Sequence, residues 1–369
     1  MTLIKLRVFF IKQKGDRLNK FIAAIIIITG IFSMQGCQRD ELITNPPANN
    51  TSVKGTYILS EGNGTPGSAK LSFLNITDNT FSVNIFSPGS IGLFPDGLLY
   101  DEGEVYITEQ GNFGSPGKVY RLDSNGNVLN SAVVGINPYS LTTANGKLYI
   151  TNGPANNVSV LNKSNLSFIT NISTGVYPQE AVSFGNTVFI ANTGTFGGDT
   201  DSTISVISAF SDQRIADIKV RQRPSSLAVT NDGKLLAGCP GNGVDGIVYK
   251  IDPQSYSILD SFLINSGTAS GFEKDISVDK NSNNIFFISN ANNIVKLDLI
   301  TKAYSVIINN ANISSDYFYG YNYDSSSRKH FIANAKNFSV NGSLNVYDEN
   351  GNLSDTFTTG IAPRRIAVK

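Results

Sequence analysis

Histidine and cysteine, two residue types that often carry acid–base and nucleophilic chemistry, are scarce. The sequence has a single histidine, His330, in the segment Lys329-His-Phe-Ile, and two cysteines, Cys37 and Cys239. A Ser-His-Asp triad would need His330 at a cleft, whereas its apolar neighbours predict the interior of a strand. Cys239 lies among small residues and is expected to be a packed side chain. We therefore predict no catalytic residues and no enzyme, with a lyase or hydrolase as the alternative.

Metal ligands are also sparse, so we assign no metal site and no cofactor. Asp123 and Asp348 each open an Asp-x-Asn-Gly-Asn segment that resembles the start of a calcium loop. An EF-hand would add an acid at the twelfth position and flanking helices, so both segments predict Asn-Gly hairpin turns instead. Asp199 and Asp201 could bind a hard cation, but an insertion loop of small residues is the interpretation we favour.

Tyr, Arg, Asn and Glu recur at two kinds of position along the chain. One lies at the start of a repeated segment that a proline often begins, and the other follows a repeated apolar run. Tyr and Arg often anchor binding sites because they combine area with directed hydrogen bonds. We predict that these residues form a non-catalytic binding face for a small-molecule or glycan ligand. The candidate ligand-binding residues are Glu61, Asn63, Asp96, Asn112, Tyr139, Asn152, Tyr177, Gln179, Asn192, Arg223, Glu273, Tyr317, Tyr319 and Arg364.

A repeat must position these residues. An apolar run that leads into a small or polar residue occurs seven times, about 40–50 residues apart, which is the length of a four-stranded propeller blade. The copies are 56–63, 104–109, 147–152, 187–192, 234–239, 285–290 and 329–334. A second, alternating segment follows each copy, and a proline begins a further strand in most copies. With 16% charged residues and 34 glycines, the chain favours short strands and turns over long helices.

The two ends of the chain predict that the ring closes. The first copy begins at Tyr57 with no proline-led strand before it, whereas the C-terminus supplies one, 363–368, with no blade after it. Joining the two removes the open edges of the ring. The prediction is an all-β, seven-bladed β-propeller of four-stranded blades, closed by its C-terminal strand. A pair of β-sandwiches or an open β-solenoid is the alternative.

The first 36 residues predict a targeting segment. A basic stretch ends at Lys20, residues 21–34 are apolar, and Gly36 precedes Cys37. This pattern resembles a lipoprotein signal peptide with Cys37 as the lipidated residue, although an uncleaved anchor helix is the alternative. Residues 37–52 are expected to form a flexible tether and 53–369 the propeller. Lipid at Cys37 would anchor the protein in the outer membrane, at the cell surface or facing the periplasm.

Charge excludes one class of partner. The chain has 29 basic and 29 acidic residues, of which six basic and one acidic lie in residues 1–36. The remainder therefore carries 23 basic and 28 acidic side chains, a net charge of −5. A mildly acidic body lacks the electrostatic footprint that a nucleic-acid backbone requires. We expect no nucleic-acid partner.

The repeats also resemble a known family. Lys147-Leu-Tyr-Ile-Thr-Asn-Gly153 and Thr187-Val-Phe-Ile-Ala-Asn192 are similar to the YVTN-type, YncE-like propellers, and Tyr57-Ile-Leu-Ser-Glu-Gly-Asn63 resembles the first blade of their surface-lipoprotein branch in Bacteroidota. One group in that branch captures vitamin B12 and related corrinoids for a TonB-dependent outer-membrane transporter. The resemblance implies nutrient capture, with a corrinoid as one candidate ligand and such a transporter as partner. A protein–protein interaction platform at the cell envelope is the alternative function.

Overall fold

The computed structural model describes residues 53–87, 93–111, 114–195, 197–240, 245–265, 271–311 and 314–369. They lie in one compact unit, Pro47–Lys369. Within these ranges the secondary structure is 28 β-strands, and no helix there is long and apolar enough to cross a membrane. The predicted signal peptide, Cys37 and the predicted tether lie outside the described residues.

The strands form seven antiparallel sheets of four, which confirms the predicted propeller. In the order from the axis outward, blade 1 has β28 (Pro363–Val368), β1 (Gly55–Ser60), β2 (Lys70–Asn75) and β3 (Thr80–Phe86), and blade 2 has β4 (Leu93–Asp101), β5 (Glu104–Gln110), β6 (Pro116–Asp123) and β7 (Val128–Ile136). Blade 3 has β8 (Pro138–Ala144), β9 (Lys147–Asn152), β10 (Asn157–Asn162) and β11 (Phe168–Ser173), and blade 4 has β12 (Pro178–Phe184), β13 (Thr187–Asn192), β14 (Thr203–Ser208) and β15 (Gln213–Lys219).

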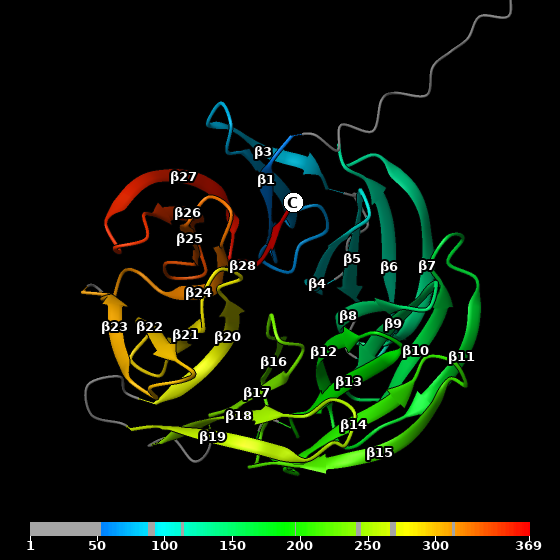
Figure 1. The fold of residues 1–369 in the computed structure, drawn as a ribbon. Coiled ribbons are helices and arrows are strands. Elements are labelled where there is room, and N and C mark those ends of the chain that lie inside the picture. Colours follow the sequence, from blue (N-terminus) through cyan, green and yellow to red (C-terminus); the bar gives the residue numbers. More distant parts are fainter. Residues whose placement is uncertain are drawn as a thin grey trace, which may run out of the picture. The chain divides into compact units, whose positions relative to one another are not determined.

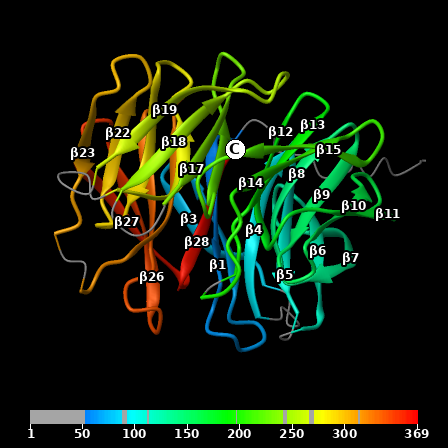
Figure 2. The same cartoon turned by 90° about the horizontal axis from the view of Figure 1, so that it is seen from below.

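The remaining three blades repeat this order. Blade 5 has β16 (Ser226–Val229), β17 (Leu235–Cys239), β18 (Gly246–Ile251) and β19 (Ile258–Ile264). Blade 6 has β20 (Phe272–Val278), β21 (Asn284–Ser289), β22 (Ile294–Asp298) and β23 (Tyr304–Ile308), and blade 7 has β24 (Phe318–Asp324), β25 (Lys329–Asn334), β26 (Asn341–Tyr347) and β27 (Leu353–Ile361). Figure 1 looks down the ring, with the innermost strands around its centre, and Figure 2 shows the blades from the side.

The ring closes as the chain ends predicted. β28 pairs antiparallel with β1, and Ile58 lies directly opposite Ile366. The C-terminus therefore lies beside the innermost strands in Figure 1, next to the first strand of the described chain. This pairing supplies the inner strand of the first blade, so that all seven blades have four strands.

The core lies between neighbouring blades. The second strand of a blade has apolar side chains on both faces because each face packs on an adjacent blade. Tyr57 and Leu59 of blade 1, for example, share a buried cluster with Val105 and Ile107 of blade 2. His330 is fully buried in β25 and its Nδ1 lies 2.7 Å from the hydroxyl of Tyr321, as expected for a residue in a strand interior.

A recurrent backbone feature shapes the entry to the innermost strands. The residue before the proline has a positive φ in five blades, at Phe94 (49°), Asn137 (47°), Tyr177 (54°), Arg223 (61°) and Ala362 (50°). This conformation is uncommon for residues other than glycine, so packing at the ring must hold it. The turn brings the chain from the outside of one blade to the axis of the next.

The predicted Asn-Gly turns are confirmed. The carboxylate of Asp123 accepts hydrogen bonds from the backbone N–H groups of Asn125 and Asn127, and Asp348 does the same with Asn350 and Asn352. Gly126 and Gly351 have φ values of 89° and 83°, which only glycine adopts easily. These carboxylates stabilise turns between the two outer strands of their blades.

Candidate functional site

A polar cavity of about 420 Å³ opens where the innermost strands begin. We call it the mouth cavity. Both predicted kinds of loop contribute to it: the starts of the innermost strands, and the loops between the second and third strands. Its lining residues are Asp96, Tyr139, Gln179, Glu180, Thr193, Arg223, Ser225, Pro240, Glu273, Lys274, Asn290, Arg364 and Arg365. Because the lining residues come from blades 1 to 6, side chains distant in sequence meet in one concave site.

Two consecutive arginines in β28 join the inner strands of four blades. Arg365 donates through Nε to Asp96 at 2.9 Å and through Nη2 to Glu180 at 2.6 Å. Arg364 donates through Nη1 to Asp275 at 2.9 Å. The five side chains are only 11–18% exposed. We call Asp96, Glu180, Asp275, Arg364 and Arg365 the ion-pair layer, which forms the floor of the mouth cavity.

Opposite charges within the ion-pair layer keep its buried Asp96 carboxyl ionised. Burial alone would raise the pKa of the Asp96 carboxyl, but the guanidinium groups of Arg365 and Arg364 lower that pKa below its usual range. A buried charge without such a partner would cost several kcal/mol. Below the layer, a second cavity of about 300 Å³ continues along the axis and shares Glu180, Arg364 and Arg365 with the mouth cavity.

Glu61 lies beside this layer. Its carboxylate accepts a hydrogen bond from the hydroxyl of Tyr319 at 3.0 Å. Burial and the nearby negative charge of Asp96 raise the pKa of Glu61 from 4.5 to about 7, in spite of the opposing charge of Arg364. The group therefore changes its charge in the neutral range, unlike an ordinary glutamate.

Lys274 reaches the mouth cavity across an aromatic group. Its ammonium nitrogen lies 4.5 Å from the ring centre of Tyr319 and 5.7 Å from that of Tyr317. Phe338 packs on both tyrosines, with ring centres 5.5 and 5.0 Å away. Burial and the positive charge of Arg364 lower the pKa of Lys274 from 10.5 to about 8. Such cation–π contacts orient an ammonium group without neutralising it.

A tyrosine pair forms another part of the rim. The hydroxyls of Tyr139 and Tyr177 lie 2.9 Å apart, and Tyr139 lines the cavity. Both rings crowd Gly153, where an added Cβ would lie 2.8 Å from Tyr139 and 2.9 Å from Tyr177. A side chain at position 153 would therefore displace the pair.

The structure brings many of the predicted site residues together. Those that line the mouth cavity are Asp96, Tyr139, Gln179, Arg223, Glu273 and Arg364. Glu61, Tyr177, Tyr317 and Tyr319 do not line it, but each contacts a lining residue or the aromatic group around Lys274. Ligand contact by any of these residues stays a prediction.

Other predicted residues lie apart from the mouth cavity. Asn152 and Asn192 are fully buried, and their side-chain amides donate to Ser159 and Ser205 within their own blades. They brace the ends of β9 and β13. Asn63 is exposed and its side-chain oxygen accepts from the backbone N–H of Thr65, which stabilises a turn. Asn112 lies outside the described residues.

Four further lining residues were expected on this face from the same loops and strand starts, but they were not chosen as candidate ligand-binding residues. Glu180, Lys274, Asn290 and Arg365 line the cavity, and Asp275 completes the ion-pair layer. The inner-strand residues among them lie two or three positions after a strand begins, one step beyond those selected. Asp275 was not expected on this face; the signal that could have found it is a charged residue near the start of a strand otherwise rich in small and apolar side chains.

At the candidate cation site, the carboxylate of Asp201 accepts hydrogen bonds from its protein neighbours. One oxygen of Asp201 accepts from the backbone N–H of Val176 at 2.7 Å, and the other accepts from the Thr203 hydroxyl at 2.6 Å. The carboxylate thus ties the β13–β14 loop to the connection between β11 and β12. Within the described ranges, no group of three His, Cys, Asp or Glu side chains could hold a metal ion.

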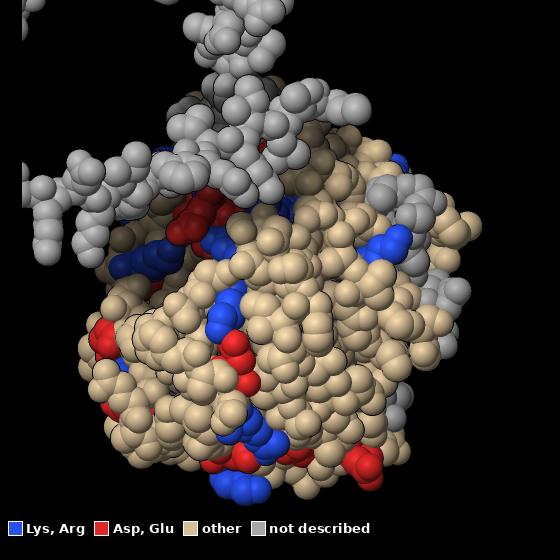
Figure 3. Space-filling view, turned by 90° about the vertical axis from the view of Figure 1, so that its right-hand side faces the viewer, with Lys and Arg blue, Asp and Glu red and all other residues tan. Residues whose placement is uncertain are grey.

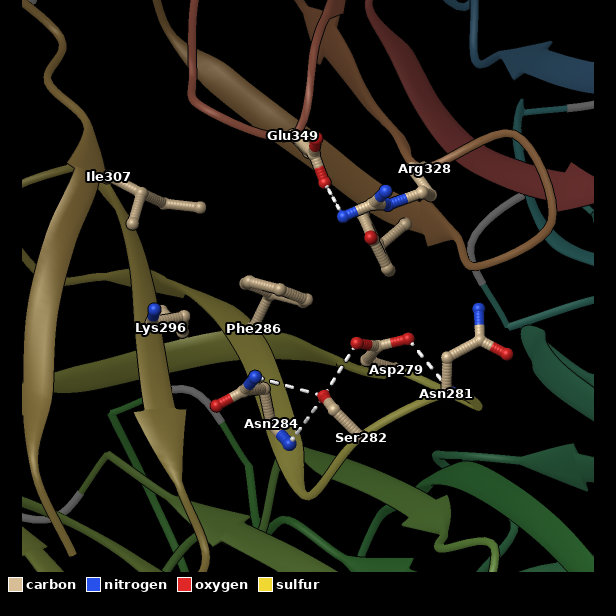
Figure 4. A pocket seen from close by; sticks show the side chains of 10 residues that line it. Asp279, Asn281, Ser282, Asn284, Phe286, Lys296, Ile307, Arg328 and Glu349 are labelled. Atoms are coloured by element: carbon tan, nitrogen blue, oxygen red, sulfur yellow. Dashed lines mark hydrogen bonds and ion pairs between the residues drawn. The ribbon is translucent and has the colours of Figure 1, made fainter. Parts of the chain in front are cut away.

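A different cavity, of about 480 Å³, lies between blades 6 and 7, among the loops of the opposite face. Figure 4 shows Phe286 at its centre, with Lys296 on one side and the Arg328–Glu349 ion pair on the other. Asp279 accepts hydrogen bonds from the backbone of Asn281 and the hydroxyl of Ser282. This cavity is separate from the axis and draws on two blades only.

The outer surface differs from the mouth in charge. On the side viewed in Figure 3, the described charged residues form a few small groups on a largely uncharged surface. No continuous basic patch crosses the described part of that side.

Comparisons with known proteins define the fold and leave the ligand open. No protein-family model matches the chain, and no curated protein matches it. A quinonprotein alcohol dehydrogenase-like protein of Bacteroides thetaiotaomicron has a TM-score of 0.64 at 15% identity, covering 84% of this chain and 77% of its own. A 6-phosphogluconolactonase-like protein of Bacteroides fragilis has a TM-score of 0.64 at 12% identity, covering 88% and 100%.

A third solved structure, hydrazine synthase of Kuenenia stuttgartiensis, has a TM-score of 0.58 at 18% identity and covers 69% of this chain and 77% of its own. At such identities the likeness concerns the fold alone. The chain is thus a seven-bladed β-propeller whose structural neighbours have varied functions and include Bacteroides proteins. The finer resemblance to the YncE-like branch stays a prediction.

Proposed function

We propose that this chain is a binding protein of the cell envelope that captures a small polar nutrient in the mouth cavity without converting it. In this proposal lipid at Cys37 anchors it in the outer membrane, and it passes its ligand to a TonB-dependent transporter. A corrinoid is one candidate ligand, and haem and glycans are others.

The observation that carries the proposal is the mouth cavity itself. Amide, phenol, hydroxyl and charged groups from separate blades converge on a concave space of about 420 Å³, within the usual range for small-molecule sites. The ion-pair layer beneath fixes the positions of the inner strands, so these groups are arranged before a ligand arrives. The chain's single histidine and Cys239 are both buried in blades, and neither lines this cavity.

The test is a binding titration of the chain 51–369, which contains every strand of the closed ring. We expect one member of a panel of corrinoids, haem and oligosaccharides to bind saturably, one molecule per chain. Replacing Tyr139 or Arg223 by Ala should weaken binding at least about tenfold, as expected for anchor residues. Lys296→Ala, in the cavity of Figure 4, is the matched control and should leave the affinity unchanged. No saturable binding by any panel member would refute nutrient capture.

A protein-interaction platform is the second candidate, and one observation favours it. The outer strands of four consecutive blades expose large apolar side chains, among them Val133 (65% exposed), Phe168 (61%), Ile215 (51%) and Leu259 (51%). Apolar groups gathered on a surface often mark a protein contact. Charged substitutions at Val133 and Phe168 should then abolish co-purification of a partner but leave small-ligand binding intact, whereas the mouth variants should do the reverse.

A further inference from the structure

Two of the four basic residues that line the mouth cavity have no carboxylate partner in an ion pair among the described residues. Its lining has four basic residues, Arg223, Lys274, Arg364 and Arg365, and three acidic ones, Asp96, Glu180 and Glu273. Arg364 and Arg365 are committed to the ion-pair layer. The groups left to meet a ligand are therefore Arg223, Lys274 and Glu273.

Arg223 and Lys274 make no ion pair with any described residue. The guanidinium of Arg223 has only a long hydrogen bond, 3.4 Å, to the carbonyl of Thr195. The ammonium of Lys274 faces the tyrosine rings described above. Arg223 directly precedes the inner strand region of blade 5 and Lys274 lies in β20 of blade 6, and the inner strands of these two blades pack side by side.

Partly buried cations are usually neutralised by an anion or lose their proton. Asp275 and Glu273 act on Lys274 electrostatically, but neither carboxylate forms an ion pair with it among the described residues. An anionic group of a ligand would supply the missing counter-charge, and the phenol and amide groups of Tyr139, Gln179 and Asn290 would meet the uncharged remainder.

We propose that the ligand carries an oxyanion, a carboxylate or a phosphate, which binds between Arg223 and Lys274 at the mouth cavity. This inference rests on the proposed function and narrows its ligand class to compact molecules with one such group on a hydrogen-bonding body. Arg supplies a planar pair of donors and Lys a point charge, and the two together suit either kind of oxyanion.

The experiment follows Lys274 by NMR in the chain 51–369 after reductive ¹³C-methylation of its lysines. The Lys274→Arg variant identifies the signal. Benzoate and phenyl phosphate are the anionic probes, and benzamide is the neutral analogue of benzoate. We expect at least one anion to move the Lys274 signal saturably and to raise its pKa, because a bound anion favours the ammonium form. Benzamide should do neither, and the response to the two anions distinguishes a carboxylate from a phosphate site.

Three variants make the assignment specific. Arg223→Gln should lower the affinity for the anion at least about tenfold, since the anion loses one of its two cationic partners. Glu273→Gln should raise the affinity for the anion, because this substitution removes a carboxylate that repels the anion and competes with it for Lys274. Lys296→Gln should have no effect, since Lys296 lines the separate cavity.

Two outcomes would overturn the inference: no response of Lys274 to either anion, or an equal response to benzamide. If a panel ligand still binds at the mouth and Lys274→Met leaves its affinity unchanged, the inference fails and the proposed function stands. If anions bind at Lys274 but no panel ligand does, the oxyanion site stands and the proposed nutrient panel is wrong.

Discussion

Replacing Glu61 by Gln should stabilise the propeller at alkaline pH and leave its stability near pH 4 unchanged. Glu61 is partly buried beside Asp96, and its pKa is raised from 4.5 to about 7. The glutamine oxygen can still accept the hydrogen bond from Tyr319, so the substitution removes the charge and keeps the contact.

The magnitude follows from the shift in pKa. Each unit corresponds to about 1.36 kcal/mol, so a rise from 4.5 to about 7 corresponds to about 3 kcal/mol. Because the folded pKa is the higher one, the contribution of this carboxyl to stability is complete below pH 4.5 and is lost as the pH rises through 7. The glutamine variant has no such loss, and its advantage should grow over that interval to at most about 3 kcal/mol.

Urea unfolding followed by tyrosine fluorescence at several pH values between 4 and 9 measures this difference. Glu102→Gln is the control, because the Glu102 side chain is 81% exposed and its surface ion pair with Lys163 should contribute less than about 1 kcal/mol. Equal stability of Glu61→Gln and the parent protein at pH 8.5 would refute the assignment, as would a gain of the same size at pH 4.

Three further predictions concern the ring. Gly320→Ala should destabilise the protein by more than about 3 kcal/mol in urea unfolding, because its Cβ would lie 1.8 Å from the carbonyl oxygen of Arg364. Arg365→Met should cost about 3–5 kcal/mol at pH 7 and less in acid, because Asp96, whose pKa the guanidinium of Arg365 lowers, can be protonated more easily once that guanidinium is removed. Cys239, whose pKa burial raises to about 12, should resist thiol reagents at pH 8 until urea unfolds the chain.

Each of these predictions has a distinct contrary result. A Gly320→Ala protein as stable as the parent would mean that the two inner strands are farther apart than described. A pH-independent effect of Arg365→Met would mean that its ion pairs contribute little to stability. Rapid labelling of Cys239 in the native protein would place its thiol near solvent.

The architecture was predictable because it depends on pattern and count. Apolar runs at blade spacing predicted the second strands, and the spare segment 363–368 predicted the pairing that places Ile366 opposite Ile58. These features rest on burial and on hydrogen bonding of strand edges, which local sequence records well. The turns at Asp123 and Asp348 were predictable for the same reason.

The site was predictable only in part because residue type does not reveal the direction of a side chain. Asn152 and Asn192 end their strands at the mouth face, as predicted, yet both amides turn into the blade and bond to serines. Arg365 and Glu180, by contrast, meet across the axis although 185 positions separate them in the sequence. Such pairing depends on the curvature of the whole ring, which no short segment of sequence specifies.

The most direct test of the central claim is a crystal structure of the chain 51–369 with a ligand that binds in the titration. The account predicts electron density for that ligand in the mouth cavity, in contact with Tyr139 and with its anionic group between Arg223 and Lys274. Density confined to the cavity between blades 6 and 7, or on the outer strands, would contradict it.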